Sequence, residues 1–233
     1  MKKSRNKNIS WSRMKKGDTL IEVILAVGIF SMVAVAVMAV MNGGAASAQM
    51  ALEATLAREE VDAQAEALRF VQASYIAEKN SSGSKYSELW NNIKNKAIET
   101  DVDMQFPPDQ CSELYKDGGE VKAKNGFVLN TRELGSDLSK VLVGVDKLQM
   151  ATTYPRLVYS DDGSLMNDSS TALNAAEGIY IVAVKDPGTH IGNNNNTTAY
   201  YDFYIRTCWY GNSSSAPSTI YTVVRLGDPY SSD

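Results

Sequence analysis

Residues 15–41 read KKGDTLIEVILAVGIFSMVAVAVMAVM, and this stretch sets the organisation of the whole chain. Its last part, from Val23 to Met41, holds 19 consecutive uncharged residues. At about 1.5 Å per residue, a helix of that length spans roughly 28 Å, which is close to the hydrocarbon thickness of a bilayer. The stretch therefore predicts a helix that can cross a membrane.

Charged residues are distributed unevenly on the two sides of this apolar stretch. Residues 1–17 hold seven basic side chains and no acidic one, whereas the rest of the chain holds 16 basic and 27 acidic groups, a net charge of -11. Because basic flanking segments stay in the cytoplasm, we expect residues 1–17 on that side and the C-terminal part outside. An acidic body repels a phosphate backbone, so we expect it to bind no nucleic acid directly.

An ordinary secretory signal peptide is an alternative interpretation of this composition. Such a peptide ends in a cleavage site of small residues, and the run Ala45-Ala46-Ser47-Ala48 fits that description. Its apolar part is usually shorter than the one found here.

A single carboxylate, Glu22, lies at the entrance of the apolar stretch. An ionised acid inside a bilayer costs about 2.5–3.5 kcal/mol on insertion scales, so such a residue is expected to have a function and a partner. If the chain is cut after Gly17, the new α-amine lies four residues before Glu22, which is one helical turn. That amine is the expected partner.

Six residues at this boundary, followed by the apolar run, resemble the class III signal sequence of type IV prepilins and of the pseudopilins of type II secretion and competence systems: Gly17, Asp18, Thr19, Leu20, Ile21 and Glu22. In that family a membrane peptidase removes a short basic leader after the glycine, and the new N-terminal residue is methylated. The resemblance implies that Gly17 is the cleavage residue and Asp18 the mature N-terminus. It also implies that Glu22 pairs with the N-terminal amine of a neighbouring subunit. The match covers about residues 15–45, and the rest of the chain only in architecture.

The same resemblance implies a structural subunit rather than an enzyme, with no cofactor. The precursor would be held in the cytoplasmic membrane and assembled into an extracellular filament for adhesion, motility, DNA uptake or secretion. Its partners would be a prepilin peptidase, other pilin subunits contacted through the N-terminal helix, the assembly platform and, before assembly, membrane lipid. Asp18 stands where major pilins usually have Phe or Met, and together with the mature length of 216 residues it favours a minor subunit.

The alternative function is a membrane-anchored or pilus-tip adhesin. Its receptor site would lie in two C-terminal loops rich in small and polar residues, 187–198 and 211–217. An aromatic row from Tyr200 to Tyr210 offers a second adhesive surface, although strand alternation is expected to bury about half of it.

The apolar run continues without proline into residues 50–79, which are rich in strong helix formers. We expect one helix from about residue 19 to about residue 79. Its second half would pack on the C-terminal domain through one face, which carries Val61, Ala65, Leu68 and Tyr75. Gly43 and Gly44 predict a bend or melting point, or alternatively the end of the spanning helix.

The remaining sequence predicts a short helix and then a sheet. Residues 80–84 are typical of a linker, and residues 86–97 of an amphipathic helix. Six stretches with strand character follow, at residues 127–129, 141–143, 157–159, 178–185, 199–210 and 219–226. The expected fold class is α+β, with a long N-terminal helix packed on a C-terminal antiparallel sheet.

This reading gives three domains: a basic leader at residues 1–17, a long helix at 18–79 and an extracellular globular domain at 80–233. The membrane-spanning or filament-core part of the helix would be residues 20–42 or so.

Two cysteines are present, Cys111 and Cys208. Outside the cytoplasm an even pair favours a disulfide, with two unpaired buried thiols as the alternative. The chain has one histidine, His190, in a Gly/Asn-rich segment, and we expect neither a catalytic nor a metal site. The acidic run at residues 161–168 predicts a hairpin turn rather than a calcium loop.

Overall fold

The structure is a computed structural model. It describes residues 18–78, 85–98, 125–145, 151, 153–159, 176–186, 190–191, 197–211 and 217–230. The chain forms two compact units that divide after Ala48. The leader at residues 1–17 lies outside the described residues, so the first unit is described here from Asp18 onward.

The first helix, α1, runs without interruption from Asp18 to Glu78, which confirms the expected long helix. It passes through Gly43 and Gly44 in helical conformation, so the alternative that these glycines end the spanning helix is wrong. Whether the pair marks a melting point stays a prediction. The division between the two units falls after Ala48, and the second half of α1 therefore belongs to the same compact unit as the sheet.

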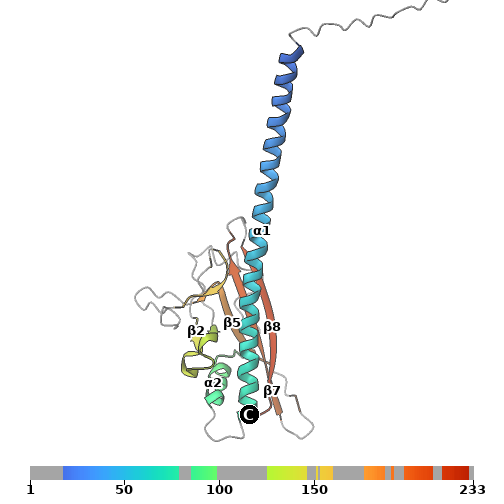
Figure 1. The fold of residues 1–233 in the computed structure, drawn as a ribbon. Coiled ribbons are helices and arrows are strands. Elements are labelled where there is room, and N and C mark those ends of the chain that lie inside the picture. Colours follow the sequence, from blue (N-terminus) through green and yellow to red (C-terminus); the bar gives the residue numbers. More distant parts are fainter. Residues whose placement is uncertain are drawn as a thin grey trace, which may run out of the picture. The chain divides into compact units, whose positions relative to one another are not determined.

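A six-stranded antiparallel sheet forms the body of the second unit (Figure 1). Its strands are β1 (Phe127–Leu129), β2 (Leu142–Gly144), β5 (Ile179–Lys185), β6 (His190–Ile191), β7 (Thr197–Trp209) and β8 (Ser218–Asp228). They pair in the order β2-β1-β5-β7, and β6 and β8 both pair with β7. The expected antiparallel sheet is thereby confirmed, with β7 and β8 paired over eleven positions.

Two expected features of the sheet differ from the structure. The segment 186–198 was expected to be loop throughout, but His190 and Ile191 form β6 against Thr197 and Thr198. The strand expected at residues 157–159 is the shorter β3 (Arg156–Leu157). It pairs with β4 (Ala176–Glu177), apart from the main sheet.

The break between β4 and β5 occurs at Gly178, which has a φ of +64°. A Cβ at Gly178 would lie 2.4 Å from the carbonyl oxygen of Cys208, so only glycine fits.

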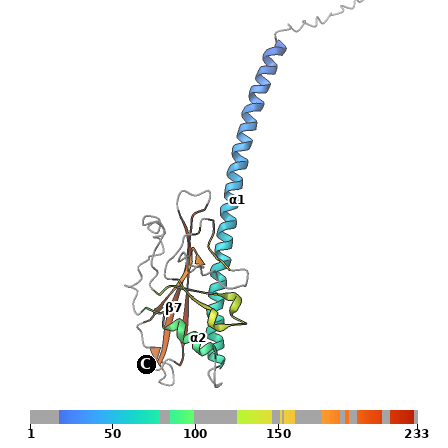
Figure 2. The ribbon, with the colours of Figure 1, turned by 90° about the vertical axis from the view of Figure 1, so that its left-hand side faces the viewer.

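The second half of α1 lies against one face of this sheet (Figures 1 and 2). Its buried side chains recur at spacings of four and three: Ala57, Val61, Gln64, Leu68, Val71 and Tyr75. The expected core positions Val61, Ala65, Leu68 and Tyr75 are all buried. The opposite face is exposed and carries five charged residues, Arg58, Glu59, Asp62, Glu66 and Arg69, which is the pattern of a helix that covers a sheet. Glu53 is buried, and Glu60 and Glu78 are half-buried.

One polar side chain on the buried face, Gln64, forms hydrogen bonds with the backbone of β1. Its amide Nε2 donates to the carbonyl oxygen of Leu129 at 2.9 Å, and its Oε1 accepts from the backbone N–H of Leu129 at 2.8 Å. β1 is paired with β5 only at Phe127, so the side chain of Gln64 satisfies the backbone where that pairing ends. Both bonds are buried, so the amide fixes the position of α1 on the sheet.

A second helix, α2 (Lys85–Lys94), closes the far end of the core. Its Trp90 is fully buried and packs on three rings from two other elements, Tyr75 of α1 and Tyr201 and Phe203 of β7. Two 3-10 turns, η2 (Thr131–Glu133) and η3 (Leu138–Lys140), connect β1 to β2 and lie beside α2.

The end of β8 is bound to both helices through one carboxylate. Asp228 is fully buried, accepts hydrogen bonds from Tyr75 at 3.1 Å and from the N–H of Tyr230 at 3.0 Å, and forms an ion pair with Lys94. Burial raises the pKa of Asp228, but the bond from Lys94 and the other donors outweigh it, and the pKa lies below its usual range. Burial and the neighbouring Asp228 raise the pKa of Tyr75 to about 12, so Tyr75 stays a neutral donor.

We expect Gln64→Leu to lower the free energy of unfolding by about 3 kcal/mol, because it leaves the N–H and carbonyl of Leu129 buried without partners. Chemical unfolding of the full chain in detergent, followed by near-ultraviolet circular dichroism, measures this. Asp62→Leu, at an exposed position of the same helix, is the control and should stay within about 0.5 kcal/mol of wild type. Equal effects of the two substitutions would show that the Gln64 amide does not anchor the helix.

A pH dependence is expected from Asp228. Its pKa is lowered in the folded state, so its contribution is fully present above the unfolded value of about 4 and is lost as the pH falls through the lower folded value. Asp228→Asn should therefore destabilise the protein at pH 7 by about 3 kcal/mol and flatten the loss of stability below pH 4 or so. Glu66→Gln removes an exposed ion pair and should do neither, and an unchanged acid profile in Asp228→Asn would contradict this assignment.

Candidate functional site

The first half of α1 exposes its apolar side chains. From Leu20 to Met41 its large hydrophobic residues are between 50% and 77% exposed. Among the described residues, α1 is the one helix long and apolar enough to cross a membrane, with a mean hydropathy of 2.8 over its most apolar window. Such a surface is unstable in water and needs a covering of lipid or protein.

Glu22 is the one charged side chain between Asp18 and Glu53, and it lies in the second turn of α1. α1 begins at Asp18, and Glu22 follows four residues later, one helical turn along the backbone. Gly17 lies outside the described residues. The processing and assembly roles of Gly17, Asp18 and Glu22 therefore stay predictions.

Of the two cysteines, the structure describes Cys208. Cys208 is buried in β7, and no cysteine among the described residues is free. Cys111 lies outside the described residues, so the pairing of the two stays a prediction.

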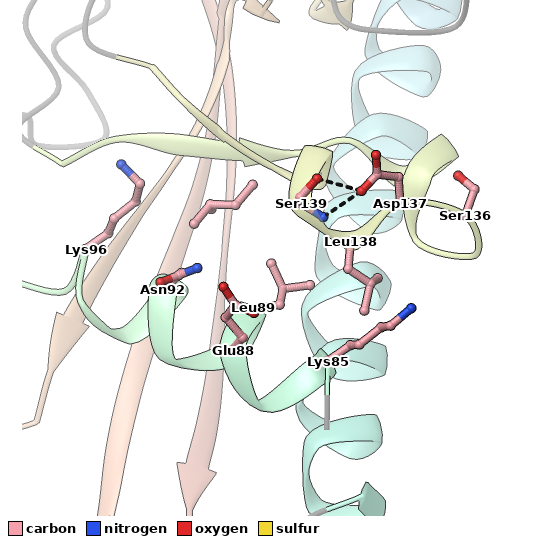
Figure 3. A pocket seen from close by; sticks show the side chains of 10 residues that line it. Lys85, Glu88, Leu89, Asn92, Lys96, Ser136, Asp137, Leu138 and Ser139 are labelled. Carbon is pink, nitrogen blue, oxygen red and sulfur yellow. Dashed lines mark hydrogen bonds between the residues drawn. The ribbon is translucent and has the colours of Figure 1, made fainter. Parts of the chain in front are cut away.

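A surface groove of about 570 Å³ lies between α2 and the turn that contains η3 (Figure 3). Its lining residues are Lys85, Glu88, Leu89, Asn92, Lys96, Ser136, Asp137, Leu138, Ser139 and Leu142. Its apolar lining comes from three leucines, and charged side chains line its rim. The volume is within the range of small-molecule and peptide sites.

The two walls of the groove differ in electrostatics. On the η3 wall, Asp137 accepts hydrogen bonds from the N–H and the hydroxyl of Ser139 and forms an ion pair with Lys140. These contacts, the Ser139 hydroxyl first, hold the pKa of Asp137 below its usual range. On the α2 wall, Lys85, Glu88 and Lys96 form no ion pair with any other described residue. This wall therefore presents charges that no other described residue balances.

The adhesin alternative rests on loops that are largely outside the described residues: 187–189, 192–196 and 212–216. In the aromatic row, Tyr201, Phe203 and Trp209 are buried, whereas Tyr200, Tyr204 and Tyr210 are partly exposed. The expected burial of about half the row is confirmed, which leaves no continuous aromatic surface along β7.

The acidic run at 161–168 is outside the described residues, and the described residues contain no group of three His, Cys, Asp or Glu that could hold a metal.

Sequence reasoning missed the groove. Its walls come from α2 and from a turn more than forty residues later, and each segment alone reads as a short element with a polar surface. One signal was available: Lys85, Glu88, Asn92 and Lys96 recur at spacings of three and four, so they share one face of a helix.

Searches of family models, curated proteins and solved structures found no match to this chain.

Proposed function

We propose that this chain is a type IV pilin-like structural subunit. It is anchored in the cytoplasmic membrane as a precursor, with residues 1–17 inside and the sheet domain outside. A prepilin peptidase removes the leader, and the mature chain joins an extracellular filament through α1. Asp18, at the expected first position of the mature chain, favours a minor subunit of that filament.

The observation that carries this proposal is the character of α1. Its first half is an exposed apolar helix with one acid near its start, and its second half is part of a folded domain. A simple membrane anchor needs the apolar helix but gives no reason for Glu22, which costs free energy in a bilayer. A filament gives that reason, because the α-amine of a neighbouring subunit can balance the acid.

Assembly by this route need not expose apolar surface to water. In the membrane, lipid covers the side chains from Leu20 to Met41. In a filament, the same side chains are covered by the helices of other subunits, so extraction exchanges one apolar environment for another. The second unit stays outside throughout and keeps its own core.

A disulfide between Cys111 and Cys208 belongs to the same proposal, because the C-terminal domain would fold in an oxidising compartment. Cys208 lies in β7, which pairs with β5, β6 and β8, so the bond would fix the segment around residue 111 to the sheet. In the chain-entropy model, closing a loop of nearly 100 residues is worth about 4–5 kcal/mol.

The first prediction of this proposal concerns processing. The basic leader ends where the apolar helix begins, so the mature protein should start at Asp18 with a methylated α-amine. Intact-mass measurement of protein taken from the cell surface tests this. A start near Ala48 would instead identify a secretory signal peptide, and retention of Met1 in filaments would contradict leader removal.

The second prediction concerns Glu22. Glu22→Gln keeps the size of the side chain and removes its charge, so the precursor should insert in the membrane and be cleaved after Gly17. Incorporation into filaments should fall about tenfold, which corresponds to a loss of ~1.4 kcal/mol per subunit. Quantitative immunoblotting of sheared filaments against membranes measures the ratio.

Asp18→Asn is the control for Glu22→Gln, because it removes an acid one turn away on the same helix. Its effect should be smaller if Glu22 is the partner of the amine. Normal incorporation of Glu22→Gln together with failure of Asp18→Asn would mean that the roles of the two acids are reversed.

A further inference from the structure

The α2 wall of the groove carries three charges in a fixed order. Lys85 and Glu88 are exposed one turn apart, and Lys96 lies at the other end with its Nζ over Gly144. Lys85 is the first residue of α2, the helix extends roughly 14 Å from there to Lys94, and Lys96 lies in the turn two residues further on. No other described side chain forms an ion pair with these three groups, and their charges sum to +1.

A second surface of the same compact unit has the opposite sum. On the outer face of α1, Arg58, Glu59 and Asp62 are exposed and form no ion pair with any described residue. Glu66 lies on the same side but is already bound to Arg69 at 2.5 Å. We call Arg58, Glu59 and Asp62 together the acidic stripe, because their charges sum to −1.

We propose that the groove between α2 and η3 binds the acidic stripe of a second copy of this chain. Lys85 and Lys96 flank the neighbour's Glu59 and Asp62, and the groove's Glu88 meets the neighbour's Arg58. The two acids are three residues apart, about 4.5 Å along their helix, and therefore fit between lysines whose side chains each reach roughly 6 Å. All six charges are balanced in the contact, whereas neither surface is balanced alone.

The symmetry of this contact agrees with a filament, and the inference rests on the proposed function in this respect. The groove and the acidic stripe are different patches, so the contact is head to tail rather than two-fold. A head-to-tail contact that does not close into a ring extends as a helical filament. It requires that two copies lie next to one another in that filament.

Photo-crosslinking in filament-producing cells tests the contact with the full chain. The photoreactive amino acid p-benzoylphenylalanine replaces Asn92, an exposed residue of the groove that has no partner among the residues that the structure describes. After irradiation, the dimer band from sheared filaments is digested with trypsin, which releases the groove segment 86–94 and the stripe segment 59–69 as separate peptides. The expected product joins these two peptides.

Charge reversal supplies the matched variants. Lys85→Glu with Lys96→Glu should lower the dimer yield about fivefold or more, and Glu59→Lys with Asp62→Lys should do the same, because like charges then face each other. Combining all four substitutions should restore the yield. Lys185→Glu, a lysine at the end of β5 outside the groove, is the control and should leave it unchanged.

The outcomes separate this inference from the proposed function. Wild-type chain in filaments, with a crosslink that maps elsewhere or to another protein, overturns the groove contact and leaves the subunit role intact. The groove contact is also overturned if the variant with all four substitutions does not recover the dimer yield, although circular dichroism shows each variant folded. Absence of the wild-type chain from any filament overturns the proposed function, and the groove contact with it.

Discussion

One constraint governs this molecule: α1 is a single helix with two different burial requirements. From Leu20 to Met41 its apolar side chains are exposed around the whole helix, which suits lipid or a bundle of similar helices. From Ala57 to Tyr75 only one face is apolar, and the sheet covers it. The change from one pattern to the other takes place without a break in the backbone, so whatever the first half binds is mechanically joined to the folded domain.

The sheet is held on α1 by polar contacts as well as by apolar packing. Apolar side chains supply most of the free energy, about 1.5–3 kcal/mol for each large one that is buried, but they tolerate sliding along the helix. Gln64 binds the backbone of β1, Gln72 donates to the carbonyl of Gly227 in β8, and Tyr75 donates to Asp228. These three bonds come from different turns of one face of α1. They reach strands in different parts of the sheet, β1 and β8. They fix both the position and the rotation of α1.

Much of the fold could be predicted from the sequence, because its strongest patterns are local. The helix from Asp18 to Glu78 follows from composition and from the absence of proline, and β7 and β8 follow from long runs of β-branched and aromatic residues. Gly178 was expected to be the first residue of a strand, but it lies between β4 and β5 with a positive φ, where the carbonyl of Cys208 passes too close for a side chain. The role of Gln64 could not be predicted either, since a glutamine at a buried helical position has no local signal for a partner 65 residues away. The groove could not be predicted for the same reason, because two segments distant in the sequence meet to form it.

Folding of the second unit depends on contacts between α1 and the last part of the chain. The bonds from Gln72 and Tyr75 reach partners 155 and 153 residues later. The second half of α1 is thus made early, but β8, which completes its cover, comes from the last part of the chain. Contacts between such distant residues close slowly. Until β8 has docked, the apolar face of the helix is open to contact with other molecules.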